Sequence, residues 1–495
     1  MSMQRWTRNL VKVAAVLLAL LPGLSAKASA QQLEVTIKVS PELGRVAIEG
    51  RGPSRTKWSF IDSYGSILGL ANRIENFQLF NEAGGPVQLR RLAPGQFESE
   101  TPAGHFKYEV KLSLPVMPAD AAMVSWLTPD RGLLMLGDLL PLPAGSDHST
   151  SAAVRFDSPD GYTVLPQQST AQSGSFQVPD IAQAVFAIGE HLRATRATES
   201  AMNINLITEG QWAFADNDVL EIVHQVLRAD GQVFGGMPAK NASLILLPYP
   251  QNASATQWSS ETRGTNVTLL MGKLPSKVGA LAQLSTPLSH ELFHLWVPNA
   301  LALDGDYDWF YEGFTMYQAA RIAVRLDLLT FQEFLNAVAH AYDLYLKDAD
   351  RDRWSLVEAS RRRWTGGSSS VYSKSMLIAL LIDLKRREAG NGRGLDDLYQ
   401  KLFAKYQVHH DGRLDLKDGN DAVTALLDSE RAMQGTVAPA INDARSIDLP
   451  RELAPYGLLV DKFGPNTRVA VAERLTRRQR DLLRELGYNA VGHSR

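Results

Sequence analysis

Residues 286–317 constrain the fold of this chain most, because side chains from two separate parts of this stretch have to meet at one point. His290, Glu291 and His294 form an H-E-x-x-H motif. Two histidines four residues apart on a helix lie one turn above each other and can bind one metal ion. Glu291 points about 100° away and can reach a water molecule on that metal. A helix is therefore expected across the motif.

Local signals favour this helix. We expect Thr286 as the N-cap, Pro287 at the first helical position, and Pro298 as the residue that stops the helix. Leucines recur at helical spacing on another face of the same segment. That face can be buried while the histidines line a cleft.

A second helix is expected to start at Asp308 as its N-cap and to run through WFYEGFTMYQAARIAV, which carries Glu312. Two imidazoles and one carboxylate leave Zn²⁺ a fourth position for water, which is the arrangement of catalytic rather than structural zinc sites. We therefore predict one Zn²⁺ per chain, bound by His290, His294 and Glu312, with Glu291 as the general base. A chance motif with satisfied surface histidines is the alternative.

The N-terminus has the pattern of a secretory signal peptide. Basic residues precede the apolar run Val13–Leu21, and Ala28-Ser29-Ala30 is typical of a cleavage site. We predict a signal peptide over residues 1–30 and export to the periplasm or the medium. An uncleaved anchor is the alternative, but the apolar run is short for a bilayer. After cleavage, no stable membrane insertion is expected.

Composition narrows the function classes further. The 495 residues have a formal net charge of −2, which gives no support to a nucleic-acid partner. The chain has no cysteine, so disulfides and thiolate metal ligands are excluded. An exported protein without disulfides depends on a large core, and a chain of this length with 45% hydrophobic residues allows one. The oligomeric state is not defined by these features.

The residue pattern changes along the chain and predicts an α+β protein. Over 31–170, short alternating runs such as LEVTIKVS and HFKYEVKLSL predict an all-β, sandwich-like domain, with the polar stretch 167–180 at its boundary. Over 171–450 we expect a catalytic domain. It has a mixed α+β lobe around KNASLILLPYP and TNVTLLMG, followed by a helical lobe. Residues 451–495 form a short C-terminal extension.

A basic run, Arg361-Arg362-Arg363, is followed by Trp364 in the expected helical lobe. Runs of like charge usually lie on a solvated face of a protein, and we expect that here. Binding of an acidic group is the alternative.

At the predicted zinc site the sequence resembles the glycyl aminopeptidase family of gluzincin metallopeptidases, distant relatives of thermolysin and aminopeptidase N. The matching segments are HELFHLW at 290–296, WFYEGFTMY at 309–317 and VYSKSMLIALLIDL at 371–384. The family shows H-E-x-x-H-x-W, W-x-x-E-G-x-x-x-Y and Y-x-K-G in the same order. The resemblance implies an N-terminal all-β domain followed by a thermolysin-like zinc metallopeptidase domain.

The resemblance also implies roles that spacing alone does not. Tyr372, in the position of the Y-x-K-G tyrosine, becomes the hydroxyl that stabilises the tetrahedral oxyanion. Glu261 lies near the place of the family's amine-binding glutamate, although the Gly-Gly-x-Glu-His segment is not recognisable around it. Thr315, one helical turn beyond Glu312, is expected to orient a zinc ligand. The family's C-terminal PDZ domain is larger than 451–495, so a full one is not expected.

These observations predict an exported zinc-dependent peptidase, either an aminopeptidase or an endopeptidase, that hydrolyses peptide bonds with a water activated by Glu291. The alternative is a catalytically impaired, zinc-stabilised peptide-binding protein, because the segment that would anchor the substrate departs from the family. A zinc hydrolase of a non-peptide substrate is the third possibility. The expected partner in the first two cases is a peptide or protein.

Overall fold

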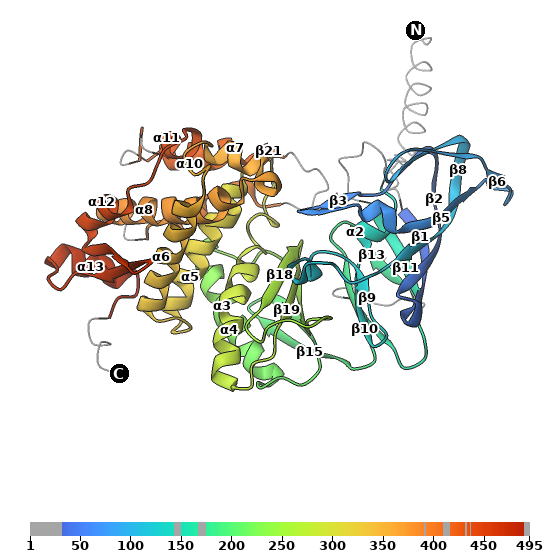
Figure 1. The fold of residues 1–495 in the computed structure, drawn as a ribbon, viewed down its shortest axis with the longest axis horizontal. Helices are drawn as coiled ribbons and strands as arrows, with labels where there is room; N and C mark the ends of the chain where they lie inside the picture. The colour runs from blue at the N-terminus through green and yellow to red at the C-terminus, as the bar shows by residue number, and fades with distance from the viewer. Residues whose placement is uncertain are drawn as a thin grey trace, which may run out of the picture.

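The structure is a computed structural model. It describes residues 32–142, 150–166, 175–390, 393–408, 416–430, 433–435 and 437–489. The predicted signal peptide and residues 167–174 of the expected boundary lie outside the described residues. The chain passes from a β-rich part through a mixed sheet to a helical part with a small C-terminal hairpin (Figure 1). Within the described ranges, no helix combines the length and the apolar character needed to cross a bilayer.

The N-terminal part consists of two main β-sheets. The first contains β1 (Gln32–Ser40), β2 (Arg45–Ser59), β5 (Ile74–Phe80), β6 (Pro86–Val87), β7 (Leu89–Ala93), β8 (Gln96–Lys111), β11 (Ser151–Asp157) and β13 (Phe176–Val178). The second contains β9 (Trp126–Leu127), β10 (Arg131–Met135), β12 (Thr163–Pro166) and β14 (Val185–Gly189). Residues of β1 alternate between buried and exposed, and the buried ones join a core around Trp58 and Phe106. The predicted all-β start of an α+β fold is confirmed.

The last two strands of these sheets follow the predicted boundary. β13 pairs with β11, and β14 pairs with β10, although both come after residue 170. The next strand, β15 (Leu192–Glu199), belongs to a different sheet. The polar composition of 167–180 resembles a linker. The sequence therefore favoured an end of the N-terminal domain before β13 and β14. The bounds of the domains themselves stay a prediction.

A five-stranded mixed sheet connects the two halves of the molecule. Its strand order is β15, β16 (Met202–Glu209), β17 (Asn241–Pro248), β19 (Asn266–Met271) and β18 (Trp258–Arg263). Alternate residues of β17 point to opposite faces. Leu244 and Leu246 pack in the core of the helical half, whereas Ile245 and Leu247 pack with Trp126 of the N-terminal part. The sheet is therefore buried on both faces, and it fixes the antiparallel edge strand β18 in place.

Helices α3 (Asp216–Phe234) and α4 (Lys277–Phe293) pack between this sheet and the helical half. α3 packs on α4, the helix that carries the H-E-x-x-H motif. α4 begins earlier than predicted, because Ser276 caps it with its side chain. The prediction of Thr286 as the N-cap is wrong, and Pro287 lies inside the helix. Buried leucines on both sides of the proline hold the helix together across the hydrogen bond that proline cannot make.

The second predicted helix begins after Asp308, as expected. It starts as a π-helical turn, η4 (Trp309–Phe314), and continues as α5 (Thr315–Arg325). Asp308 makes no capping hydrogen bond with its side chain; its carboxylate accepts a hydrogen bond of 3.1 Å from Arg363 instead. The start of the helix was therefore predicted correctly, and the role of the aspartate side chain was not.

The remaining elements complete the helical half. They are α6 (Phe331–Lys347), α7 (Leu356–Arg361), η6 (Ser370–Lys374), α8 (Ser375–Glu388), α9 (Asp396–Tyr406), α10 (Gly419–Asp428), α11 (Val437–Asn442), α12 (Leu449–Leu453), β22 (Leu458–Phe463), β23 (Asn466–Val471) and α13 (Arg477–Glu485). The C-terminal segment is attached to this half: the backbone N–H of Thr467 donates to Asp343 of α6 at 2.9 Å, and Leu483 is buried in the same core.

Gly313 is the point where η4 lies closest to η6 and α8. A Cβ atom there would be 2.7 Å from the carbonyl oxygen of Val371 and still closer to the Cβ of Ser375. Gly313→Ala should therefore overpack this contact and destabilise the protein by about 1–3 kcal/mol. Thermal unfolding should show a lower Tm.

Gly279→Ala is the matched control, because a Cβ at this helical position would have its nearest neighbour at 3.7 Å. Alanine forms helices better than glycine by about 1 kcal/mol, so the Tm of this variant should be unchanged or higher. Equal Tm values for Gly313→Ala and the wild type would contradict the close packing of η4.

Candidate metal centre and catalytic cleft

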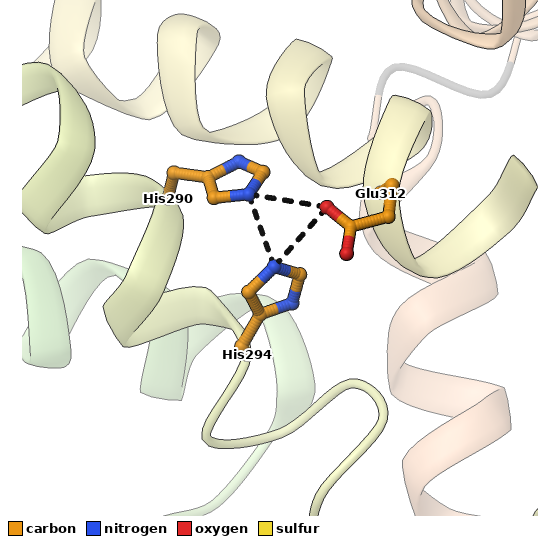
Figure 2. A group of neighbouring side chains, drawn as sticks. All are labelled: His290, His294 and Glu312. Atoms are coloured by element: carbon orange, nitrogen blue, oxygen red, sulfur yellow. Dashed lines mark hydrogen bonds and ion pairs between the residues drawn. The ribbon is translucent and has the colours of Figure 1, made fainter. Parts of the chain in front are cut away.

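The three predicted zinc ligands meet between α4 and η4. The Nε2 atoms of His290 and His294 are 3.0 Å apart, and Oε2 of Glu312 lies 3.4 Å and 3.5 Å from them (Figure 2). His294 and Glu312 are buried, and His290 is partly exposed toward the cleft. Residues from two helices are thus brought together by packing, as the sequence predicted.

The spacing of these atoms fits a zinc ion. Ligand atoms about 2.0–2.1 Å from a tetrahedral zinc are separated from one another by about 3.3 Å. The three observed separations, 3.0, 3.4 and 3.5 Å, lie around this value. Two imidazoles and one carboxylate are also the donor set of catalytic zinc sites. His290, His294 and Glu312 would therefore hold the ion.

The ring of His294 is held in the orientation that a metal ligand needs. Its Nδ1 atom lies 2.9 Å from the carbonyl oxygen of Val297. A carbonyl only accepts hydrogen bonds, so Nδ1 carries a proton and Nε2 is the ring nitrogen left to bind a metal. The turn that ends α4 at Phe293 supplies this carbonyl.

Charge in the site is balanced around Glu312. Burial would raise the pKa of Glu312, but Arg363 and His294 hold this pKa well below its usual range. Burial would lower the pKa of His294, whereas Glu312 raises it to about 9. In the metal-free protein the carboxylate is therefore ionised and pairs with a protonated His294. A bound metal ion would displace that proton.

Glu291 follows His290 on α4, and its carboxylate accepts hydrogen bonds from side chains of the edge strand β18. Ser260 donates to Oε1 at 2.6 Å, and Thr262 donates to Oε2 at 2.6 Å. Residues 260 and 262 share one face of the strand because side chains alternate along it. These neutral donors orient the carboxylate in the cleft without a cationic partner. The sequence reasoning did not identify either hydroxyl.

Glu261 lies in the same cleft, and its carboxylate is partly buried. It accepts a hydrogen bond from the hydroxyl of Tyr64, and its Oε1 is 3.9 Å from Nε of Arg263. Tyr64 belongs to the hairpin of β3 (Ser63–Tyr64) and β4 (Ile67–Leu68) in the N-terminal part. Burial raises the pKa of Glu261. The N-terminal part therefore completes the cleft, a contact that no local sequence pattern indicates.

Tyr372 lies in η6 and also lines the cleft. Burial and the charge of Glu312 raise its pKa, so the phenol remains protonated at neutral pH and can donate a hydrogen bond. Thr315 does not make the predicted contact. Its buried hydroxyl has no hydrogen-bond partner among the described residues, so the structure gives it no role in orienting Glu312.

Arg363 does not lie on a solvated face. Its side chain is only 11% exposed, and it forms ion pairs with Asp308 and Glu312. The prediction of a solvated basic run is wrong for this residue. It fits Arg361, which is 61% exposed and paired with Asp306 at the surface. Composition does not distinguish the two arginines, because only the fold turns one of them inward.

The cleft has a volume of about 530 Å³, and the zinc ligands, Glu291, Glu261, Arg363 and Tyr372 all line it. A second cavity of about 270 Å³ borders His290 and Tyr372. Its lining is largely apolar and includes Ala319, Ala320 and Met376. The site therefore combines a polar cleft with an adjacent pocket for apolar groups.

Comparison with solved structures identifies the class of fold. An aminopeptidase N family protein from Idiomarina loihiensis aligns with a TM-score of 0.72 over 87% of this chain and 79% of that chain, at 15% identity. An M1 zinc metallopeptidase from Deinococcus radiodurans aligns with a TM-score of 0.54 over 85% of this chain and 95% of that chain, at 14% identity. The predicted fold class is thus confirmed as aminopeptidase N-like.

The family comparison is more specific. Residues 283–378 match the model of the M61 glycyl aminopeptidase family. This segment includes all three candidate ligands, Glu291 and Tyr372, so the predicted resemblance to the glycyl aminopeptidase family of gluzincins is confirmed. A comparison with curated proteins gives no match. Together the fold and the family segment support a zinc metallopeptidase of the aminopeptidase class.

Zinc content tests the metal centre directly. His294→Ala removes one of three ligands, so we expect bound zinc to fall from one ion per chain to nearly none. Mass spectrometry of the metal after gel filtration measures this. Removal of zinc from the wild type by a chelator should also lower its Tm, because zinc at 1,000 times its Kd stabilises the folded state by about 4 kcal/mol.

His105→Ala is the control, because His105 lies in β8 of the N-terminal sheet and should not affect metal binding. One zinc ion per chain in the purified His294→Ala variant would exclude the proposed ligand set.

Proposed function

We propose that this protein is a zinc-dependent aminopeptidase that hydrolyses the first peptide bond of peptides with a free N-terminus. The observation that carries this proposal is the position of Glu261. This partly buried carboxylate lies in the same cleft as the zinc ligands and Glu291, and Tyr64 of the N-terminal part contacts it. The polar groups of the cleft therefore support a peptidase with an anchor for an amine.

For each step of the hydrolysis, the cleft contains a side chain that can carry it out or a residue that can bind zinc. Zinc, when bound, polarises the substrate carbonyl and lowers the pKa of the attacking water. Glu291, oriented by Ser260 and Thr262, accepts a proton from that water and transfers it to the leaving nitrogen. A C–O bond forms, the C–N bond breaks, and the proton leaves with the amine. Tyr372 donates a hydrogen bond to the oxyanion that develops on the carbonyl oxygen.

Glu261 favours cleavage at a free N-terminus. A protonated α-amine would pair with this partly buried carboxylate, whereas an internal peptide segment has no charge there and would leave it without a cationic substrate group. One of the structural relatives supports a peptide substrate. A mutant of the Deinococcus radiodurans metallopeptidase has been solved with a Tyr-Ser-Ala substrate. Mutant two-domain M1 zinc metallopeptidases have been solved with L-arginine and with L-tryptophan.

The alternative, a catalytically impaired protein that binds peptides, receives less support from the cleft. In the cleft, the hydroxyls of Ser260 and Thr262 orient Glu291, and Tyr372 is protonated. These features serve hydrolysis directly and are not needed for zinc binding alone. We also propose that the protein acts after export, on the basis of the signal-peptide pattern in residues 1–30.

Glu291→Gln tests the hydrolytic step. The amide cannot accept the proton of the attacking water, so kcat for a dipeptide should fall at least about 10²-fold while one zinc ion stays bound. Glu221→Gln, at an exposed position of α3, is the control and should leave both values unchanged. Full activity of Glu291→Gln would exclude the mechanism. Wild-type protein that binds zinc but cleaves no peptide in a broad library would favour the binding protein.

Glu261→Gln tests the position of the cut. Loss of the charge pair with the substrate amine should lower kcat/KM for peptides with a free N-terminus about 10–100-fold, because a hydrogen bond to a charged group contributes about 1.5–3 kcal/mol. N-acetylated peptides should be poor substrates of the wild type. Digestion of a peptide library followed by sequencing of new N-termini measures both. Internal cuts by the wild type would contradict an aminopeptidase.

A further inference from the structure

Arg363 links the metal centre to the tyrosine that faces the oxyanion. Its Nη2 atom donates to Oε1 of Glu312 at 2.7 Å and also to the hydroxyl oxygen of Tyr372. Its Nη1 atom donates to Asp308 at 3.1 Å and to Tyr311 at 3.3 Å. The two terminal nitrogens of one guanidinium therefore contact residues of η4, of η6 and the residue directly before η4.

The contact with Tyr372 fixes where the phenol proton can go. A guanidinium only donates hydrogen bonds, so the oxygen of Tyr372 is the acceptor in this pair. The single O–H of Tyr372 is then free to donate to another group. Because Tyr372 lines the cleft, this group is the substrate oxygen when a peptide is bound.

The contact with Glu312 gives the two carboxylate oxygens different partners. Oε1 accepts from Arg363, and Oε2 is the oxygen that lies near both histidines. Rotation of the carboxylate would break a charge-assisted hydrogen bond in a buried site. Arg363 also supplies the positive charge that a buried carboxylate needs before a metal ion is bound.

We propose that Arg363 is a positioning residue that orients Glu312 as a one-oxygen zinc ligand and directs the hydroxyl of Tyr372 toward the substrate. It acts through these two residues and does not contact the reacting atoms itself. Its Nη2 atom contacts Glu312 and Tyr372 while its Nη1 atom contacts Asp308, and the single nitrogen of a lysine does not reproduce these two fixed positions. The part of the proposal that concerns Tyr372 rests on the proposed function, whereas the part that concerns Glu312 needs only a zinc site.

Arg363→Gln should change two separate measurements. In a competition titration with a chromogenic chelator, zinc affinity should fall about 10–100-fold, as expected when a partner that orients a metal ligand is lost. At saturating zinc, kcat for a dipeptide should fall about 10–100-fold, because both Glu312 and Tyr372 lose their orientation. KM should change little, because Arg363 does not hold the substrate. Arg361→Gln, a surface arginine two residues away, is the matched control and should match the wild type.

A double-mutant cycle with Tyr372→Phe separates the two contacts. If Arg363 directs the hydroxyl of Tyr372, Arg363→Gln should reduce kcat less in the Tyr372→Phe background than in the wild type. Equal reductions in both backgrounds would overturn the role at Tyr372. Zinc affinity equal to that of Arg361→Gln would overturn the role at Glu312.

Arg363→Lys covers the case in which the glutamine variant does not fold. It keeps a positive charge beside Asp308 and Glu312 but cannot form the planar contacts, so losses of zinc affinity and kcat should persist. Wild-type values for the lysine variant would overturn the proposal. The zinc titration distinguishes this failure from that of the proposed function: a wild type that cleaves no peptide would exclude the aminopeptidase, while the titration would still test Arg363.

Discussion

The buried carboxylate of Glu312 is the group on which the whole site depends. An ionised carboxylate placed in a protein interior costs several kcal/mol unless cations and hydrogen bonds compensate it. Here His290 and His294 approach one oxygen from α4, and Arg363 contacts the other. The charge is compensated where α4, η4 and the 3-10 turn that carries Arg363 converge. The fold of the helical half and the chemistry of the cleft are therefore set by the same contacts.

The β-rich half contributes through one strand and one hairpin. β17 is buried on both faces, which makes the mixed sheet rigid and places the edge strand β18 over α4. Alternation along β18 then divides its side chains. Ser260 and Thr262 hold Glu291, the proposed general base, whereas Glu261 contacts Tyr64 of the N-terminal hairpin. The same strand thus serves the group proposed to break the peptide bond and the group proposed to select it.

Sequence reasoning succeeded where residues act at a fixed local spacing. The i, i+4 pair His290 and His294 is recognisable because helical geometry alone brings such residues to one side. Glu312 was expected from the second predicted helix, and packing of the two helices brings it to the histidines. The expected all-β start followed from alternation within single strands. Sequence reasoning failed at the start of α4. Ser276 rather than Thr286 caps the helix, and buried leucines stabilise the helix on both sides of Pro287.

Reasoning from sequence also missed the partners that are distant in the chain. Arg363 is part of a basic run that resembles a solvated face, yet the 3-10 turn η5 (Arg363–Thr365) after α7 directs it toward Glu312. Tyr64 lies far from Glu261 in sequence and meets it only because the two halves of the molecule pack together. No periodicity or composition encodes such contacts. Tyr372 was found only through its resemblance to the family motif, and Thr315 was assigned a contact that its side chain does not make.

A crystal structure of the zinc-loaded protein with a phosphonate analogue of a dipeptide would test the account most directly. We expect anomalous scattering from one zinc ion among His290, His294 and Glu312. The amine of the analogue should lie within hydrogen-bond distance of Glu261, and one phosphonate oxygen should accept from Tyr372. An amine of the analogue that lies away from Glu261, or zinc at other residues, would contradict a zinc aminopeptidase.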